Sequence, residues 1–183
     1  MGRPSAIPVI DLMLEIPTGK AGMGMKQARA LTKDRGTDEF SHHPAQYLFK
    51  DAGDRMSVAS DPDLVVQMMD HFGVQMAQVA VSPRHPEGAL AMFEKYPSRF
   101  FGEVGVDPNR GMESVRALEQ TVALHPNIKA ASAAPCLLNP QVPIDDRKFY
   151  PIYAKCCELD ISVTHVCVVI IVCVFGCGSL RCE

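Results

Sequence analysis

The sequence predicts an α/β fold: a partial TIM-like (β/α) barrel of about five strands with crossover helices, incomplete at its C-terminus. Two observations lead to this prediction. Apolar, β-rich segments alternate with amphipathic helical segments, most clearly from Phe100 to Ile161, and turns marked by Pro and Gly separate them. This rhythm is typical of parallel α/β proteins. The strand–helix steps number about five, whereas a closed barrel needs about eight.

The first predicted strand is Pro8 to Leu14, an apolar run in which Asp11 is the one charged residue. Such a run is typical of a strand buried on both faces. From Ile16 to Ser60 the apolar residues follow neither the helical nor the strand periodicity, and Gly, Pro, Lys and Asp interrupt the chain. Because ordinary connections are much shorter, this segment is interpreted as a functional loop or a flexible insertion.

A helix is predicted from Asp61, a good N-cap residue that Pro62 follows at the first helical position, to Gly73. The later elements follow in order: a strand at Met76–Val81, a helix at Glu87–Tyr96, a strand at Phe100–Val106, a helix at Gly111–Leu124, a weaker strand at Ile128–Ala133, a helix with Pro151 at its first position, and a fifth strand from Ile161.

Spacing and turn residues justify these later elements. Each helix carries apolar residues three and four positions apart, which form one stripe to pack against a sheet. Proline stops the helix at Pro97, and His125-Pro126-Asn127 closes the next one. The inward stripes are Leu90, Met92 and Phe93; Val115, Leu118 and Val122; and Ile152, Cys156 and Leu159.

Composition bounds the class of protein. A chain of 183 residues that is 47% hydrophobic with net charge -3 is long enough for one domain with a sizeable core. Lys and Arg are scattered rather than gathered on one face, so nucleic-acid binding is not expected. The first ten residues lack the apolar core of a signal peptide, which favours a cytoplasmic location.

The seven cysteines favour reduced thiols rather than a disulfide framework, because their number is odd and none precedes Cys136. Four of them lie in the last 17 residues: Cys167, Cys173, Cys177 and Cys182. They lack the short paired spacing of structural zinc sites, so free thiols in an apolar tail are favoured over metal binding.

Short connections between strands and helices require right-handed parallel crossovers, so consecutive strands should be neighbours. Chemistry in such sheets takes place at the carboxyl ends of the strands. These ends correspond to Leu14–Thr18, Ser82–His85, Val106–Arg110, Ala133–Leu138 and the residues after Thr164.

Four segments carry a resemblance to a known family: VIDLMLEIP (Val9–Pro17), RFFGEVGVDPNRG (Arg99–Gly111), QVPIDDRKFYP (Gln141–Pro151) and YAKCCELDI (Tyr153–Ile161). Together they resemble the amidohydrolase-related family of metal-dependent hydrolases and decarboxylases, which contains aminocarboxymuconate semialdehyde decarboxylase. The resemblance covers most of residues 9–164. It implies a (β/α)8 barrel that binds a divalent metal, usually zinc, and acts on a small-molecule substrate.

The resemblance also implies which residues would hold the metal. Family members carry His-x-His, sometimes Glu-x-His, just after the Asp of the first strand, and these slots here hold Met13 and Glu15. A thioether is a poor zinc ligand and a carboxylate an acceptable one. A further family ligand is a His on the fifth strand. His165 lies one residue early for this place, so it is either ligand-equivalent or turned to the opposite, helix-facing side.

The other histidines are interpreted as solvated loop, turn or helix-end residues: His42, His43, His71, His85 and His125. Arg110 can bind a carboxylate from the end of the third strand, but an Arg in a turn after Asp-Pro is more often solvated. Glu15 and His165 are therefore the only candidate metal ligands. Since catalytic zinc needs about three protein ligands, zinc is expected to bind weakly or not at all.

The chain is divided into a partial amidohydrolase-like barrel, residues 1–166, and an apolar, Cys-rich tail, residues 167–183. Three interpretations of the tail stand: an out-of-frame or mis-spliced end, a buried strand with a frayed tail, and a membrane anchor. The first is favoured, because thiol-rich sequence broken by Gly makes a poor helix, so membrane association is not expected.

Two functions are therefore expected. One is an amidohydrolase-related hydrolase or decarboxylase, truncated and catalytically impaired. The other is a non-catalytic remnant or interaction protein, with the tail as an optional membrane-associating segment. In either case the unpaired first and fifth strands should promote self-association through their exposed edges.

Overall fold

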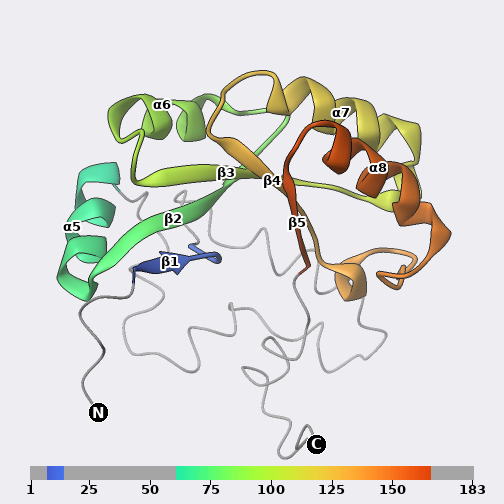
Figure 1. Cartoon of the computed structure of the whole chain (residues 1–183), viewed down its shortest axis with the longest axis horizontal. Coiled ribbons are helices and arrows are strands. Elements are labelled where there is room, and N and C mark those ends of the chain that lie inside the picture. The colour runs from blue at the N-terminus through green and yellow to red at the C-terminus, as the bar shows by residue number, and fades with distance from the viewer. Residues whose placement is uncertain (1–7, 15–60, 166–183) are drawn as a thin grey trace, which may run out of the picture.

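A computed structural model describes residues 8–14 and 61–165, and all statements below concern these residues. Five strands form one parallel sheet in the order β1-β2-β3-β4-β5. The sheet curls into a half-barrel with helices between the strands along the chain (Figure 1). The predicted α/β class and partial TIM-like barrel are confirmed.

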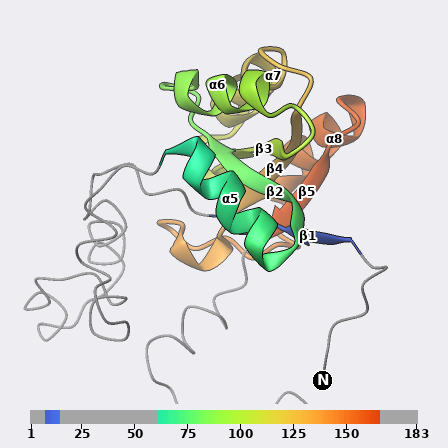
Figure 2. The same cartoon turned by 90° about the vertical axis from the view of Figure 1, so that its left-hand side faces the viewer.

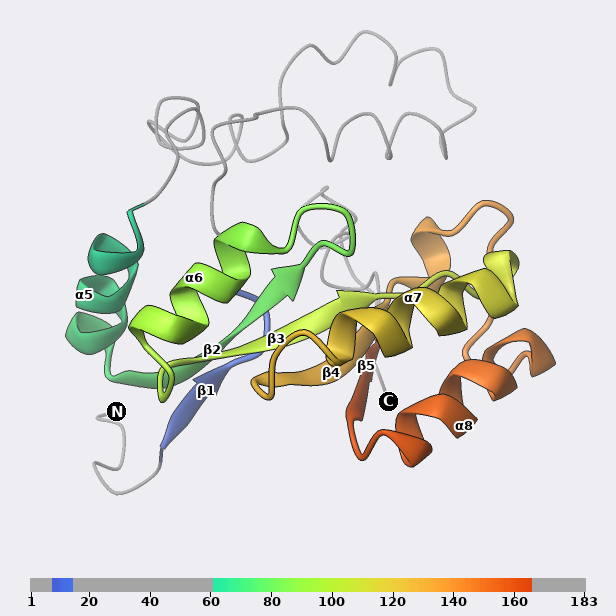
Figure 3. The same cartoon turned by 90° about the horizontal axis from the view of Figure 1, so that it is seen from above.

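The strands are β1 (Val9–Asp11), β2 (Val74–Val81), β3 (Phe100–Gly105), β4 (Ile128–Ala133) and β5 (Ser162–His165). The α-helices are α5 (Pro62–Phe72), α6 (Glu87–Lys95), α7 (Met112–Val122) and α8 (Tyr150–Glu158). Short 3-10 helices are η1 (Pro108–Arg110), η2 (Pro135–Leu137) and η3 (Arg147–Phe149). The α-helices follow one another along the outer, convex side of the sheet (Figure 3). This arrangement places the carboxyl ends of all five strands at one rim.

Helix α5 forms as its terminal residues predict. The Asp61 carboxylate accepts a hydrogen bond from the Asp63 N–H at 3.0 Å, and Pro62 occupies the first helical position. Gly73 ends the helix with φ of 66°, a left-handed conformation that glycine adopts without steric cost. In Figure 2 this helix lies nearest the viewer, beside β2.

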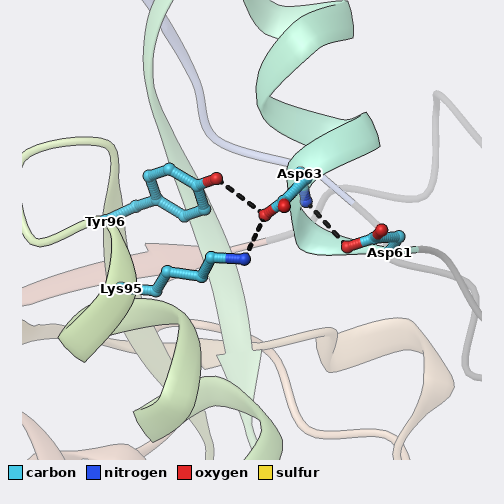
Figure 4. A network of polar contacts seen from close by, with 4 residues as sticks. All are labelled: Asp61, Asp63, Lys95 and Tyr96. Atoms are coloured by element: carbon cyan, nitrogen blue, oxygen red, sulfur yellow. Dashed lines mark hydrogen bonds and ion pairs between the residues drawn. The ribbon is translucent and has the colours of Figure 1, made fainter.

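Polar contacts join α5 to the end of α6 (Figure 4). The Asp63 carboxylate accepts hydrogen bonds from the Tyr96 hydroxyl, at 2.7 Å, and from the Lys95 ammonium. These bonds lower the pKa of Asp63, the Lys95 bond contributing most. The cluster holds two neighbouring helices together and lies away from the carboxyl-end rim of β2–β4.

The hydrophobic core lies between the sheet and the helices. Its largest fully buried side chains include Phe93, Phe100, Leu118, Phe149 and Ile152, which come from α6, β3, α7, η3 and α8. Helices α6, α7 and α8 thus contribute residues of their predicted apolar stripes to one continuous cluster, whereas in α5 Met69 is buried and Leu64, Met68 and Phe72 are exposed.

Strand register assigns each residue to one of two faces. Val81, Val104 and Ala131 pair across neighbouring strands and are buried in the core, so they face the helices. Since side chains alternate along a strand, Gln78 and Glu103 point to the opposite, concave face. The register places Thr164 opposite Ser132 on that same face.

Several boundaries differ from the predicted ones. Strand β1 spans Val9–Asp11 rather than the whole apolar run, and β2 begins at Val74, before the predicted Met76. The weaker predicted strand, Ile128–Ala133, forms with the predicted bounds because alanines in it pack directly against the helices. Within the described residues, no helix is long and apolar enough to cross a lipid bilayer.

Candidate functional site

A polar cluster lies on the concave face of the half-barrel. The Gln78 amide donates a hydrogen bond to Glu103 Oε2. The Thr164 hydroxyl lies within hydrogen-bond distance of the same oxygen, at 3.4 Å, and of the Ala131 carbonyl, at 3.3 Å. Gln78 is only 3% exposed, and Glu103 and Thr164 are half-buried. A buried amide needs a partner, because leaving it without one costs about 1–3 kcal/mol. The cluster therefore fixes the Glu103 carboxylate in place between β2 and β5.

A cavity of about 490 Å³ lies at the carboxyl ends of β2, β3 and β4, between these strand ends and α7. Gly105 and Ser132, which pair across β3 and β4, form one wall, and Ser114 and Ala117 of α7 form the other. The cavity lies at the strand ends, where barrel proteins place their chemistry. Its chemically active lining residues are Ser82, Arg84, Asp107, Arg110, Ser114 and Ser132.

The polar groups around the cavity have defined partners. The Asp107 carboxylate accepts from the Asn109 N–H at 2.9 Å, inside its own turn. The Ser114 hydroxyl oxygen accepts from the Asp107 N–H at 3.0 Å, and the Ser82 hydroxyl oxygen accepts from the His85 N–H at 3.3 Å. The Arg110 guanidinium pairs with the Glu113 carboxylate.

Asn109 ties two loops of this rim together. Its amide nitrogen donates to the Pro140 carbonyl at 2.8 Å, and its amide oxygen accepts from Lys148 Nζ at 3.1 Å. The loop after β3 is thereby joined to the loop after β4 at two points.

His165, a predicted metal ligand, lies on the helix-facing side of the sheet. It pairs with Ala133, which is buried in the core, and its ring meets those of Phe149 and Tyr153 with centroids 5.4 and 5.9 Å away. This is the second of the two predicted orientations, and it follows from the period of two along a strand. His165 and the Glu103 carboxylate therefore lie on opposite faces.

The hydrogen bonds of Tyr153 assign the His165 proton. The Tyr153 hydroxyl donates its one hydrogen to the Ile144 carbonyl, at 2.6 Å, so its oxygen accepts from His165 Nε2, at 3.0 Å. His165 Nδ1 then carries a lone pair, and it is buried without a hydrogen-bond partner among the described residues. Burial lowers the pKa of this imidazole, which favours the neutral form.

The other predicted ligand, Glu15, lies outside the described residues, as do His42, His43 and the tail of residues 167–183. Met13, in the neighbouring family slot, is 57% exposed, and its N–H donates to the Asp11 carboxylate at 2.9 Å. Over residues 8–14 and 61–165, no three His, Cys, Asp or Glu side chains gather in a group that would hold a metal ion.

His125 and Cys156 have structural roles. His125 Nδ1 accepts from the Asn127 N–H at 3.0 Å, and its ring packs against Phe93 with centroids 5.1 Å apart. Burial raises the pKa of the Cys156 thiol to about 11, so this thiol is protonated and unreactive at neutral pH. The other cysteines within the described part of the chain, Cys136 and Cys157, are also free thiols.

Sequence reasoning missed Gln78 and Glu103. Each is one polar residue inside an apolar strand, in MAQVAV and FFGEVG. A polar residue at such a position is a signal for the interior of a barrel, and the two together indicate a pair. The apolar residues around them predict only the strands, and the pairing depends on the register between β2 and β3.

We compared the chain with models of protein families, with curated proteins and with solved structures, and none of them matches it. The resemblance to the amidohydrolase-related family therefore stays a prediction. The fold and the two polar features at its rim and concave face are what the structure establishes.

Proposed function

We propose that this chain is an amidohydrolase-related protein, a hydrolase or decarboxylase of small molecules in a catalytically impaired form. The observation that supports the proposal is the half-barrel with the Glu103 carboxylate fixed on its concave face. Consecutive parallel strands with helices outside are the architecture that the resemblance implies. Barrel enzymes of this kind bind their substrates at the carboxyl ends of the strands.

Glu103 is the residue on which we base the chemistry. A carboxylate inside a barrel exchanges a proton with water or with a substrate that is within hydrogen-bond distance. Gln78 donates a hydrogen bond to one of its oxygens, so the orientation of the carboxylate is fixed before a substrate binds. Such positioning by a neutral amide leaves the carboxylate charge available to act as a base.

Zinc is the cofactor that the resemblance implies, and it would supply a polarised carbonyl or an activated water. The described residues do not fit it. His165 Nδ1 has a lone pair, but the His165 ring packs against the rings of η3 and α8. Among the residues described, His165 belongs to no group of three His, Cys, Asp or Glu side chains that could hold a metal ion. We therefore propose that zinc binds weakly or not at all, which is the reason for the impaired activity.

The test is a turnover assay on the whole chain with carboxylated aromatic compounds and simple amides, with and without added zinc. We expect slow turnover that Glu103→Gln reduces by at least about a hundredfold, since general acid–base catalysis contributes that much. Glu87→Gln is the matched control, because Glu87 is exposed on α6. Equal rates in the two variants would refute the role of Glu103.

A second candidate function is a non-catalytic interaction protein. The orientation of His165 and the one-sided pairing of β1 and β5 within the described residues favour it. It predicts no turnover above the rate of the Glu103→Gln variant, together with self-association. Turnover separates the two: a rate above that of the Glu103→Gln variant would favour the enzyme and contradict the interaction protein. About one tightly held zinc ion per chain would refute the proposal that zinc binds weakly or not at all.

A further inference from the structure

We infer that the cavity at the carboxyl ends of β2, β3 and β4 binds the anionic group of a small molecule, a carboxylate or a phosphate. This inference names the kind of molecule that the proposed enzyme would bind. It rests on the proposed function only where it treats that molecule as the substrate. The cavity has a volume of about 490 Å³, which is within the range of small-molecule sites.

The charges that line the cavity favour an anion. Arg84 and Arg110 are the basic residues of the lining, and Asp107 is the acidic one. The Asp107 carboxylate already accepts the Asn109 N–H inside its own turn. The two guanidinium groups outnumber the one carboxylate, so the lining carries a net positive charge, and guanidinium matches the geometry of carboxylate and phosphate.

The hydroxyl groups of the lining add hydrogen-bond donors. Ser114 is buried, and its oxygen accepts the Asp107 N–H, which leaves its hydroxyl hydrogen to donate. The Ser82 hydroxyl is arranged in the same way by the His85 N–H. Two guanidinium groups and two donating hydroxyls surround one space, and a group that only accepts hydrogen bonds fits it best.

Glu113 shows that one carboxylate can interact with both arginines. It pairs with Arg110, and the charge of Arg84 also contributes to lowering the Glu113 pKa, after the Arg110 hydrogen bond and charge. The side chains of Arg110 and Glu113 are 46% and 67% exposed, so their ion pair is screened by water and weak. An anion in the cavity would replace Glu113 as the partner of these guanidinium groups.

The inference is tested by calorimetric titration of the whole chain with succinate, with inorganic phosphate and with succinamide, the neutral analogue of succinate. We expect succinate, phosphate or both to bind, and succinamide not to bind. Arg84→Gln and Arg110→Gln should each weaken binding by about tenfold or more, the value of a charge-assisted hydrogen bond. Glu113→Gln should tighten binding, because it removes the competing carboxylate.

Arg116→Gln is the matched control, because Arg116 is exposed on α7 and does not line the cavity. Circular dichroism of each variant checks that it folds. The inference is overturned if Arg84→Gln and Arg110→Gln bind like Arg116→Gln, if neither anion binds at millimolar concentration, or if succinamide binds as well as succinate. A comparison of succinate with phosphate distinguishes the two sources of the anion.

Binding and turnover are measured separately, so their failures are distinguishable. Anion binding that depends on both arginines, without turnover, would support the inference and contradict the proposed enzyme. Turnover whose KM is unchanged in Arg84→Gln and Arg110→Gln would support the enzyme and overturn the inference.

Discussion

At Gly102, β3 passes so close to α6 that a side chain has no room. A Cβ atom there would lie 2.7 Å from Val81 Cγ2 and 2.9 Å from Phe93 Cζ, and both of these side chains are buried. We expect Gly102→Ala to lower the free energy of unfolding by about 1–3 kcal/mol, the usual effect of overpacking a core. Urea denaturation measures it.

Gly88→Ala is the control for this substitution. Gly88 lies in α6, and a Cβ atom added there would meet no other atom within 4 Å, so alanine should leave the stability unchanged or raise it by up to about 1 kcal/mol. A Gly102→Ala protein as stable as Gly88→Ala would contradict the close approach of Val81 and Phe93.

Asp63 makes the stability depend on pH. Hydrogen bonds from Lys95 and Tyr96 lower its pKa below the unfolded value. Its contribution to stability is therefore complete above the unfolded pKa, about 3.9, and is lost as the pH falls through the lower, folded pKa. We expect the difference in unfolding free energy between the wild type and Asp63→Asn to shrink on acidification below pH ~4.

Asp145→Asn is the matched comparison, because Asp145 is exposed. The difference in unfolding free energy between Asp145→Asn and the wild type should change less over the same pH range. If the Asp63→Asn difference stays constant on acidification, the contacts drawn in Figure 4 do not stabilise the protein in solution.

Individual residues also show how far sequence can predict a site. Side chains alternate between the two faces along any strand, so the sequence alone predicted two alternative orientations for His165. The structure shows the helix-facing one. The contact between Gln78 and Glu103 was not predicted, since it joins residues that are 25 positions apart and depends on strand register. The cavity was predicted only in part: three of the predicted strand ends meet there, but the role of Ser114 requires knowing how α7 packs.

At the scale of the element, α5 depends on its N-terminal cap. Asp61→Ala removes the acceptor for the Asp63 N–H, and we expect it to lower the free energy of unfolding by about 1 kcal/mol. Asp61→Asn should retain most of the stability, because Asn is an equally good cap. Thermal denaturation of the two variants measures the difference, and equal losses would show that charge rather than capping stabilises this end.

The helices and strands themselves were predictable, because apolar stripes and turn residues are local signals in the sequence. Asp61 and Gly73 marked both ends of α5, whereas Pro151, predicted at the first position of its helix, is the second residue of α8. The start of β2 was predicted two residues late. The Arg99 side chain donates to the Val74 and Gln75 carbonyls, at 3.0 and 2.9 Å, and this contact from a distant residue orders the start of the strand.

At the scale of the whole molecule, β1 and β5 each pair on one side only within the described residues. Ile10 and Leu12, in and after β1, are 49% and 52% exposed. We expect the purified chain to self-associate through these edges, and Ile10→Lys with Leu12→Lys to reduce it, because edge lysines oppose strand pairing. Multi-angle light scattering measures the mass of each protein.

Met112→Lys is the control for this prediction, since Met112 is equally exposed but lies on α7, away from the edges. It should leave the association unchanged. A wild-type chain that is monomeric and unfolds cooperatively would contradict the prediction, whatever the variants do.

The nearest-neighbour order of the sheet has a consequence for synthesis on the ribosome. Each strand pairs with the strand made just before it, so contacts form between segments that emerge one after another. The chain can therefore grow its sheet during translation, one βα unit at a time, with each newly made unit covering the temporary edge left by the previous one.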